Sequence, residues 1–379
     1  MSRRLVLVGT YPPRRCGLAT FAAHLLDAVR GTGLIRDIEV LPVVEEGEGI
    51  RQKFLPDYRE AARYVNSLPS VTVSLQHEFG IFGGPDGEYV LDFTAELQKP
   101  LVTTFHTVLA HPDERKRKII RLLARKSQMV TVMARRGMEI LTSVYGVERE
   151  KIAIIPHGVP DPPPITPREA KEMLGVEGRV VIATMGLLNP GKGIEYALEA
   201  LPPVVEEFPE VIYLVVGETH PGVRRIHGES YRESLLGLVE RLGLREHVRF
   251  VNSYLGQEEL LCYLLATDIY VTPYLGREQI TSGTLAYAVG MGKAVVSTPY
   301  YHAEELLGGG AGCLVDFRDP EGIARALLQL LRNPHRRHLC EARARMLGRS
   351  MRWSLLGSQY ARLFLETMEA APRTTVLRG

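Results

Sequence analysis

The sequence has little net charge, few cysteines and no long hydrophobic run. Its 46 Lys and Arg residues almost balance 44 Asp and Glu residues, which leaves a net charge of +2. Such a balance argues against nucleic acid as the main partner. The four cysteines are scattered, without a Cys-x-x-Cys pair or a Cys/His cluster, so neither a disulfide framework nor a structural zinc site is indicated. We therefore expect a reducing compartment.

No targeting segment is evident either. The apolar run at residues 5–8 is too short for the core of a signal peptide and far too short to span a membrane. We therefore expect a cytoplasmic protein. With 379 residues, of which 45% are hydrophobic, the chain is long enough for two or three domains with sizeable cores.

Short apolar runs recur along the chain, and helical patterns separate them. Continuous runs rich in Val and Ile are typical of strands covered on both faces, and the helical intervals supply the crossovers of parallel sheets. The proline-dense segment 156–164 divides the runs into two sets, and it can neither join a sheet nor continue a helix. We therefore predict an α/β protein with two doubly wound halves and a linker between them. The expected strands are 5–8, 38–44, 71–75, 101–105, 129–133 and 152–155 in the first half, and 180–185, 211–216, 248–251, 269–272, 294–297 and 313–317 in the second.

The stretch 273–306 has the order strand end, loop, helix and strand. Ser282 is a preferred residue for the start of a helix, and the backbone amides of Gly283 and Thr284 would then face whatever lies before that helix. A phosphate would bind these amides, whereas Glu278 on the preceding loop is suited to accept hydrogen bonds from neutral hydroxyls. A sugar joined to a phosphate could bind the amides through its phosphate and Glu278 through its hydroxyls. An ordinary strand-to-helix corner with a capped helix is the alternative.

A second loop, residues 186–193, has the spacing Gly-x-x-x-x-Gly-Lys of a phosphate loop. Gly193 stands where a nucleotide hydrolase needs a Ser or Thr hydroxyl for magnesium, so a magnesium-dependent hydrolase is disfavoured. Lys192 remains suitable as a point charge for a diphosphate. Gly217 and Tyr254 follow the next two expected strands. All these loops leave the carboxyl ends of parallel strands, so we expect them to meet along one edge of the sheet, where open parallel sheets bind their ligands.

Three loops of the first half occupy the corresponding rim. Gly17 opens a helical pattern after the first strand and would let a ligand approach the backbone, although a plain loop is equally compatible. Residues 76–84 mix polar, aromatic and glycine residues, which suits sugar binding. His106 directly follows the fourth expected strand, where a histidine is often a structural residue but would here point into a cleft.

Residues 115–126 form a basic helix with an apolar face. A solvated surface helix is the favoured interpretation, and weak contact with a membrane surface is the alternative.

Taken in order, these motifs resemble the GT-B glycosyltransferases of family 4, a large retaining group that uses nucleotide sugars such as GDP-mannose and UDP-glucose. Trp353 is similar to the aromatic residue at the start of the family's last helix, which crosses back to the N-terminal domain. The other similar segments are the glycine loop 13–17, His106, the interdomain segment 154–159, the loop 186–193 and the segment 278–296.

The resemblance implies two Rossmann-like domains that face a central cleft. Residues 1–158, completed by a C-terminal helix at 351–379, would bind the acceptor, and residues 159–350 would bind the nucleotide sugar. The implied reaction moves a hexose to an acceptor hydroxyl with retention, and GDP-mannose is favoured over UDP-glucose. No cofactor or metal is implied, and the Asp-x-Asp motif of metal-dependent GT-A enzymes is absent from the sequence. A sugar phosphorylase of the same fold and a non-catalytic sugar- or nucleotide-binding protein are the alternatives.

The resemblance also assigns roles to single residues. His106, Glu278 and Lys192 would be catalytic. The donor would meet Gly17, Gly186, Lys192, Gly217, Tyr254, Glu278, Gly283 and Thr284, and the acceptor would meet His77, Glu78, Phe79 and Gly80.

Three departures from the family pattern stand out. Leu187 replaces the usual Arg of the loop after the first strand of the second half. The family's second Glu, which holds the ribose, falls on Ala286 or, when counted back from Gly292, on Tyr287. The triplet Ser-Gly-Thr at 282–284 is also similar to the phosphate loop of glycogen-phosphorylase-type enzymes, but their pyridoxal-phosphate lysine has no counterpart here.

Overall fold

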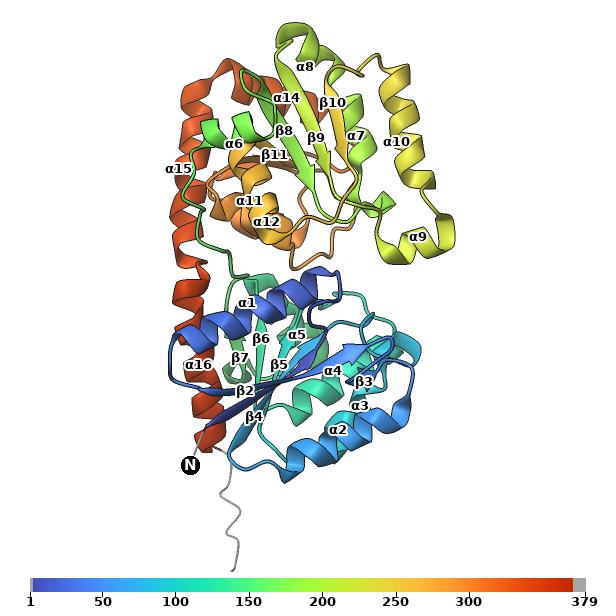
Figure 1. Cartoon of the computed structure of the whole chain (residues 1–379), viewed down its shortest axis with the longest axis vertical. Coiled ribbons are helices and arrows are strands. Elements are labelled where there is room, and N and C mark those ends of the chain that lie inside the picture. Colours follow the sequence, from blue (N-terminus) through green and yellow to red (C-terminus); the bar gives the residue numbers. More distant parts are fainter. Residues whose placement is uncertain (1–2, 371–379) are drawn as a thin grey trace, which may run out of the picture. The chain divides into compact units, whose positions relative to one another are not determined.

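A computed structural model describes residues 3–370 of the chain. The chain divides into two compact units (Figure 1). One unit runs from the N-terminus to Gly158 and includes the C-terminal segment from Trp353 onward, and the other comprises Val159–Arg352. The chain therefore passes between the units twice, and its last helix belongs to the same unit as its first strand.

The first unit is built on one parallel sheet of seven strands in the order β3-β2-β1-β4-β5-β6-β7. After β1 the chain adds strands on one side, and from β4 it adds them on the other, so the order reverses between β1 and β4. The strands are β1 (Arg4–Gly9), β2 (Asp37–Val44), β3 (Ile50–Arg51), β4 (Val71–His77), β5 (Leu101–Phe105), β6 (Met129–Val132) and β7 (Ile152–Ile154). The helices are α1 (Gly17–Gly31), α2 (Leu55–Ser67), α3 (Val90–Glu96), α4 (Glu114–Lys126), α5 (Arg135–Tyr145) and α16 (Trp353–Ala370), with short 3-10 turns η1 (Pro85–Gly87) and η2 (Arg149–Lys151).

Helices α1 and α16 pack against each other (Figure 1), and on the sheet α1 contacts β1 whereas α16 contacts β4 and β5. Gly357 makes this approach possible, because a Cβ there would lie 2.4 Å from the carbonyl oxygen of Ala28. Gly158 plays a similar part, since its Cβ would lie 2.2 Å from the ring of Trp353. The shared apolar cluster joins residues from both ends of the chain, which explains why the C-terminal helix belongs to this unit.

The second unit contains a six-stranded parallel sheet in the order β10-β9-β8-β11-β12-β13. Its strand order reverses between β8 and β11. The strands are β8 (Val180–Met185), β9 (Val211–Val216), β10 (Val248–Val251), β11 (Ile269–Thr272), β12 (Ala294–Ser297) and β13 (Gly312–Leu314). The helices are α6 (Pro167–Met173), α7 (Ile194–Glu199), α8 (Pro202–Glu207), α9 (Pro221–His227), α10 (Ser230–Arg241), α11 (Gln257–Ala266), α12 (Gly283–Gly290), α13 (Tyr301–Leu307), α14 (Pro320–Arg332) and α15 (Pro334–Ser350), with one 3-10 turn η3 (Pro190–Lys192).

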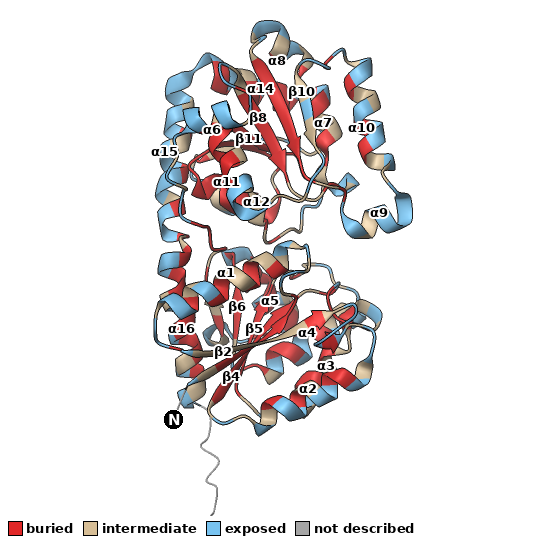
Figure 2. Cartoon of the chain, in the orientation of Figure 1, coloured by how far each residue is buried: buried red, intermediate tan, exposed pale blue. Residues whose placement is uncertain are grey.

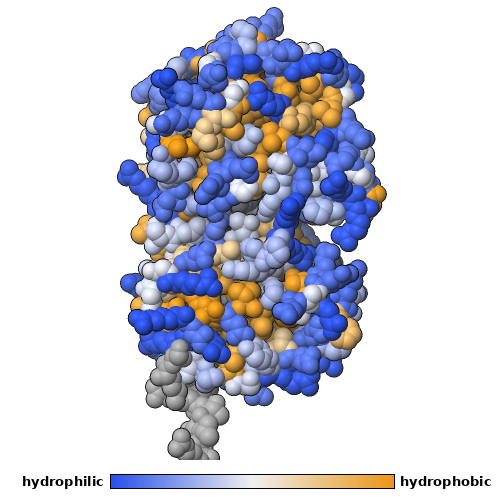
Figure 3. Space-filling model, in the orientation of Figure 1, coloured by the Kyte–Doolittle hydropathy of each residue, from blue (hydrophilic) through white to orange (hydrophobic). Residues whose placement is uncertain are grey.

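Both sheets are buried between their helices, whose outer faces are exposed (Figure 2). In the second unit two separate apolar clusters lie on the two faces of the sheet: Val181 and Ala183 of β8 belong to one, and Ile182 to the other. Burial on both faces accounts for the continuous rather than alternating apolar runs in the sequence. The visible surface is mainly hydrophilic, with hydrophobic residues in scattered groups (Figure 3).

The predicted α/β class and all the predicted strands are confirmed. The two-residue strand β3 was not predicted, because so short a run carries no pattern. The last strand ends at Leu314, three residues earlier than predicted. Within the described residues, no helix has the length and apolarity that crossing a membrane would require.

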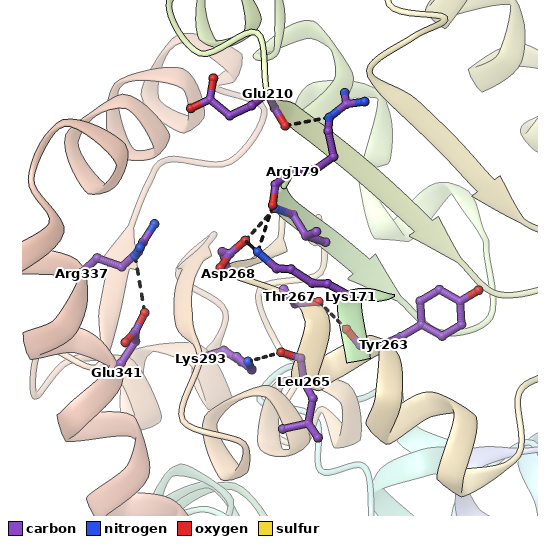
Figure 4. A network of polar contacts seen from close by, with 11 residues as sticks. Lys171, Arg179, Glu210, Tyr263, Leu265, Thr267, Asp268, Lys293, Arg337 and Glu341 are labelled. Carbon is purple, nitrogen blue, oxygen red and sulfur yellow. Dashed lines mark hydrogen bonds and ion pairs between the residues drawn. The ribbon is translucent and has the colours of Figure 1, made fainter. Parts of the chain in front are cut away.

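A polar network lies at the amino end of the second sheet (Figure 4). Asp268, just before β11, accepts hydrogen bonds from the backbone N–H of Val181 at 2.7 Å and from Lys171 Nζ at 2.6 Å. Lys293, just before β12, donates from Nζ to the carbonyl oxygen of Leu265, near the end of α11, at 2.8 Å. Burial lowers the pKa of Lys293 to about 8. The network fixes the starts of β8, β11 and β12 to α6 and α11.

Candidate functional site

The reversal of strand order in the second unit brings together the loops that follow β8 and β11. The two strands are neighbours in the sheet, and the loops after them comprise residues 186–193 and 273–282. In an open parallel sheet such a reversal leaves a crevice at the carboxyl ends of the strands, which is where ligands bind. The loops that carry Lys192 and Glu278 therefore stand at the position that the topology favours.

The loop after β8 is fitted closely against the loop after β11. Gly193 has φ +60°, and a Cβ at this residue would lie 2.2 Å from the carbonyl oxygen of Pro273. The backbone N–H of Leu275 donates to the carbonyl oxygen of Gly191 at 2.9 Å. Any side chain at Gly193 would collide with this neighbouring loop. The absence of the Ser or Thr that the phosphate-loop pattern has at this position therefore has a structural cause.

The loop after β9 is joined to the loop after β8 by backbone hydrogen bonds. The N–H of Leu188 donates to Glu218, and the N–H of His220 donates back to Leu188, both at 2.8 Å. A Cβ at Gly217, which has φ +140°, would lie 2.2 Å from the carbonyl oxygen of Gly186. Gly217 is thus buried in a contact between loops, and its predicted contact with a donor remains a prediction.

Lys192 is held by an aromatic residue that follows β11. Its Nζ donates to the hydroxyl of Tyr274 at 2.5 Å and lies 4.0 Å from the centre of that ring. The Tyr274 hydroxyl also lies 2.9 Å from Oγ1 of Thr284. Gly186 completes the group, because its Cβ would lie 3.3 Å from Cγ2 of Thr284 and 3.5 Å from Nζ of Lys192. Residues from the loop after β8, from the loop after β11 and from α12 therefore lie within a few ångströms of one another.

Helix α12 presents unsatisfied amides to this group. Ser282 is its N-cap, and its Oγ accepts a hydrogen bond from the N–H of Leu285 at 3.3 Å. The N–H of Ser282 itself donates to Nδ1 of His302 at 2.9 Å. In the described part of the chain the N–H groups of Gly283 and Thr284 have no acceptor. Such amides at the positive end of a helix dipole favour an anion.

Glu278 lies on the loop just before this helix and is partly exposed. The residues on each side of it are attached to the start of α13. The N–H of Tyr301 donates to the carbonyl oxygen of Arg277, and the N–H of His302 donates to that of Gln279, each at 3.1 Å. The loop is therefore held in place, and the role of Glu278 toward a sugar remains a prediction.

The two candidates for the family's second Glu lie in the core. Ala286 is fully buried and Tyr287 is 6% exposed, and both belong to the apolar cluster that covers one face of the sheet. Burial raises the pKa of Tyr287 well above its usual value. Tyr254, which follows β10, is partly exposed. Neither Ala286 nor Tyr287 supplies a carboxylate for a ribose.

In the first unit the strand order reverses between β1 and β4, so the topology favours the loop that leads to Gly17 and the loop that begins at Glu78, while His106 follows β5, the neighbour of β4. Helix α1 begins at Gly17, which is exposed and has open space around the position of a Cβ. His106 follows β5 and lies with Nε2 2.9 Å from Oε1 of Gln76 and with its ring 4.9 Å from that of Phe21, edge to face. Burial, together with the nearby His157 and His77, lowers the pKa of His106 to about 3. The imidazole is therefore neutral at neutral pH.

The four residues predicted to bind the acceptor differ in accessibility. His77 has no exposed surface, and its ring lies among those of Phe79, Phe82 and Phe105. Burial lowers the pKa of His77 to about 3. Its ring therefore cannot touch an acceptor unless these aromatic side chains move.

The next three residues of this loop are more open. Glu78 is partly exposed, accepts hydrogen bonds from Thr107 and from the N–H of Phe79, and has a pKa that burial raises. Phe79 is 9% exposed and Gly80 is exposed. An acceptor contact at these three residues remains a prediction.

Sequence reasoning did not single out Tyr274 or His302, whereas Gln76 lay within the predicted sugar-binding loop 76–84. Tyr274 stands two residues beyond Thr272, the last residue of β11, so its place near a strand end was a usable signal. Its contact with Lys192 was not, because the two residues are 82 positions apart.

Other features of the described residues do not add to this site. They contain no group of three or more His, Cys, Asp and Glu residues that could hold a metal ion. A groove of about 870 Å³ runs along the edge strand β13 and helix α14, and its lining includes Cys313, Arg325, Arg332 and Arg336. None of the residues that line it belongs to the loops described above.

The fold is shared with other solved proteins. HepE of Anabaena, solved in complex with UDP and glucose, superposes with a TM-score of 0.73 at 16% identity, covering 96% of this chain and 99% of that one. Sucrose-phosphate synthase of Thermosynechococcus elongatus gives a TM-score of 0.76 at 16% identity, with 97% and 100% covered. The protein therefore has the GT-B fold.

Sequence comparison identifies the family. The family model described as Glycosyl transferases group 1 matches residues 179–333, and that described as Glycosyltransferase Family 4 matches residues 45–161. With one model on each unit, the chain belongs to the family 4, group 1 glycosyltransferases.

Two mannosyltransferases of Mycolicibacterium smegmatis are among its relatives. Phosphatidyl-myo-inositol mannosyltransferase is 31% identical over 196 residues, which covers 52% of this chain and 47% of the relative. GDP-mannose-dependent alpha-(1-6)-phosphatidylinositol monomannoside mannosyltransferase is 26% identical over 269 residues, covering 67% and 66%. The chain thus spans about half the length of the first relative and two thirds of the second.

Proposed function

We propose that the protein transfers a hexose from a nucleoside-diphosphate sugar to an acceptor hydroxyl, with retention at the anomeric carbon. The observation that carries this proposal is the convergence of the Lys192 ammonium with the unsatisfied amides of Gly283 and Thr284 at the strand reversal of the second unit. A cation beside a helix N-terminus suits the diphosphate of such a donor.

The chemistry requires stabilisation of the leaving group. The bond between the anomeric carbon and the diphosphate oxygen breaks, a bond to the acceptor oxygen forms, and the acceptor proton leaves with the diphosphate. Lys192 and the two amides would stabilise the negative charge that develops on the diphosphate. Glu278 would orient the hydroxyls of the sugar, and the neutral His106 would exchange hydrogen bonds with it. No step requires a metal or a cofactor.

The identity of the donor is part of the proposal. GDP-mannose is favoured, because one relative is named as GDP-mannose-dependent and others as mannosyltransferases. UDP-glucose is the next choice, since HepE was solved with UDP and glucose. With a buried alanine and a buried tyrosine where the family has its second Glu, binding of the nucleotide would rest more on its diphosphate than on its ribose.

A thermal-shift screen followed by a turnover assay tests this function. We expect either GDP and GDP-mannose or UDP and UDP-glucose to raise the melting temperature, and the matching nucleotide sugar to release nucleoside diphosphate slowly even without an acceptor. Stabilisation by inorganic phosphate, with no response to any nucleotide, would instead favour a sugar phosphorylase, because the same amides of α12 suit free phosphate. Nucleotide binding without any sugar transfer would favour a non-catalytic binding protein.

Helix α4 is the basic helix for which a contact with a membrane surface is the alternative. Arg115 and Lys116 form ion pairs with Asp86, whereas the side chains of Lys118 and Arg125 are exposed beside Leu122, which is 40% exposed. We favour a solvated surface helix in a cytoplasmic protein. Binding to vesicles of anionic lipid at low salt, lost when four cations of α4 are replaced by Gln, would establish the alternative of a peripheral membrane contact.

A further inference from the structure

Tyr274 joins the two anion-binding elements of the second unit. Its hydroxyl accepts a hydrogen bond from Nζ of Lys192 at 2.5 Å and lies 2.9 Å from Oγ1 of Thr284. Lys192 belongs to the loop after β8, whereas Thr284 is the second residue of α12. A single phenol oxygen therefore connects the side chain that carries the positive charge to the helix end that carries the unsatisfied amides.

The ring of Tyr274 is itself immobile. It is 2% exposed and stacks on Tyr300 with ring centres 5.2 Å apart and an angle of 15° between the planes. The carbonyl oxygen of Tyr274 accepts a hydrogen bond from Oγ1 of Thr298 at 2.6 Å. Because both ring and backbone are held, the position of the hydroxyl is set before any ligand arrives.

The chemical nature of the contact matters for an anion. A carboxylate in this place would orient the ammonium equally well, but it would cancel the charge and repel a diphosphate. A phenol carries no charge while it is protonated, so it orients the ammonium and leaves that charge in place. Burial raises the pKa of the Tyr274 hydroxyl, but the adjacent Lys192 charge and the hydrogen bonds outweigh burial and lower it. Lysine has three N–H donors, so after the bond to Tyr274 the Lys192 ammonium retains two for a ligand. Holding a flexible lysine in advance also lowers the conformational entropy lost on binding.

We propose that Tyr274 is a positioning residue for the donor diphosphate, holding the Lys192 ammonium and the N-terminus of α12 in one fixed arrangement. This inference rests on the proposed function, since it assumes a diphosphate ligand. It assigns to Tyr274 part of the donor affinity that the missing second Glu cannot supply.

The test compares two phenol deletions from the same aromatic stack. Tyr274→Phe keeps the ring and removes the hydroxyl that Lys192 contacts. Tyr300→Phe removes an equally buried hydroxyl that contacts Oγ1 of Thr272 and the side chains of Ser282 and Ser297, but not Lys192, and serves as the control for loss of a buried phenol. Circular dichroism and melting temperature establish that both variants fold. Thr284→Val, which removes the other partner of the Tyr274 hydroxyl, provides an independent variant.

The choice of ligands distinguishes binding of the diphosphate from binding of the base. Binding constants are measured for GDP and UDP, for guanosine and uridine, and for inorganic pyrophosphate. We expect Tyr274→Phe to weaken the nucleoside diphosphate and pyrophosphate by about tenfold, while nucleoside binding changes less than about twofold. Thr284→Val should weaken the same two ligands by about threefold. Tyr300→Phe, whose hydroxyl contacts the N-cap Ser282 but not Lys192, should weaken them by less than about twofold.

Three results would overturn the inference. The first is unchanged diphosphate and pyrophosphate affinity in folded Tyr274→Phe. The second is an equal loss of nucleoside and diphosphate binding, which would show a general structural defect. The third is an equal effect of Tyr300→Phe. If the parent protein binds pyrophosphate but no nucleotide, the proposed function fails while the pyrophosphate comparison still decides the role of Tyr274; if it binds neither, both fail.

Discussion

Two lysines at opposite ends of the second sheet show how position decides what a charge can do. Lys293, at the amino end, is 8% exposed and caps the last turn of α11 through the carbonyl oxygen of Leu265, close to a network that contains the carboxylate of Asp268 (Figure 4). The side chain of Lys192, at the carboxyl end, donates a hydrogen bond within the described residues only to the hydroxyl of Tyr274. At the amino end the charge of Asp268 is paired with Lys171 and the charge of Lys293 is disfavoured by burial, whereas at the carboxyl end the charge of Lys192 is oriented toward the place where an anion would bind.

This contrast predicts that changes at the amino end reduce stability and changes at the carboxyl end reduce activity. The largest effect should follow Asp268→Ala. The variant removes the acceptor for both Lys171 Nζ and the N–H of Val181, and we expect a loss of about 3 kcal/mol in the free energy of unfolding. Urea denaturation measures it. Asp268→Asn, which retains an acceptor for Val181, is the control and should lose about half as much. A stable Asp268→Ala variant would show that the network is not structural.

The pH dependence of stability tests Lys293. The unfolded chain holds this proton up to its ordinary pKa of 10.5, whereas the folded protein releases it near 8. Between these values the unfolded state binds more protons, so the contribution of Lys293 to stability rises with pH, by about 2 to 3 kcal/mol over the whole window. The measurement is the difference in unfolding free energy between the parent and Lys293→Met from pH 7.5 to 10.5. Other groups titrate in both proteins and cancel, so a constant difference would refute the lowered pKa.

Activity should respond at the carboxyl end. We expect Lys192→Ala and Glu278→Ala each to lower kcat/KM for the nucleotide sugar by at least about tenfold, a cost of ~1.4 kcal/mol or more in transition-state binding. Neither side chain is buried in the core, so the melting temperature should change little. Near-parental kinetics in Lys192→Ala would mean that the diphosphate binds elsewhere.

The smallest effect is expected for Tyr287→Phe. Its side chain packs in the core of the second unit, so removing the hydroxyl should change kcat/KM by less than about twofold. Steady-state kinetics of Tyr287→Phe and Lys192→Ala, measured under the same conditions, provide the comparison. A large loss in Tyr287→Phe with full activity in Lys192→Ala would require α12 to be aligned with the family in another register.

The fold was predictable because the signals are local. Runs such as 211–216 and 269–272 are continuous and apolar, and they became β9 and β11 with the predicted bounds. The N-cap at Ser282 was also predictable, since a hydroxyl residue before an apolar-periodic segment is a local signal. The two-residue β3 carries no such pattern and was missed.

The candidate site was predictable only in part. The loops of Lys192 and Glu278 follow from strand ends in the sequence, and the structure places those loops at the strand reversal. The complete burial of His77 did not follow, because its ring packs against Phe105 of the next strand, β5, and against Phe82, whose position depends on how the loop after β4 folds. Burial is a property of packing, which residue type alone does not specify.

By itself, then, the sequence determined the two sets of strands, the anion-binding helix start and the family, because each of these is written in residues that are neighbours along the chain. Only the tertiary structure decided that Gly193 must lack a side chain, because the carbonyl oxygen of Pro273 would lie 2.2 Å from its Cβ. It alone decided that Lys192 is held by a phenol, because that contact joins loops 82 positions apart. Contacts of this kind depend on the adjacency of β8 and β11 in the sheet, which arises only when the chain has folded.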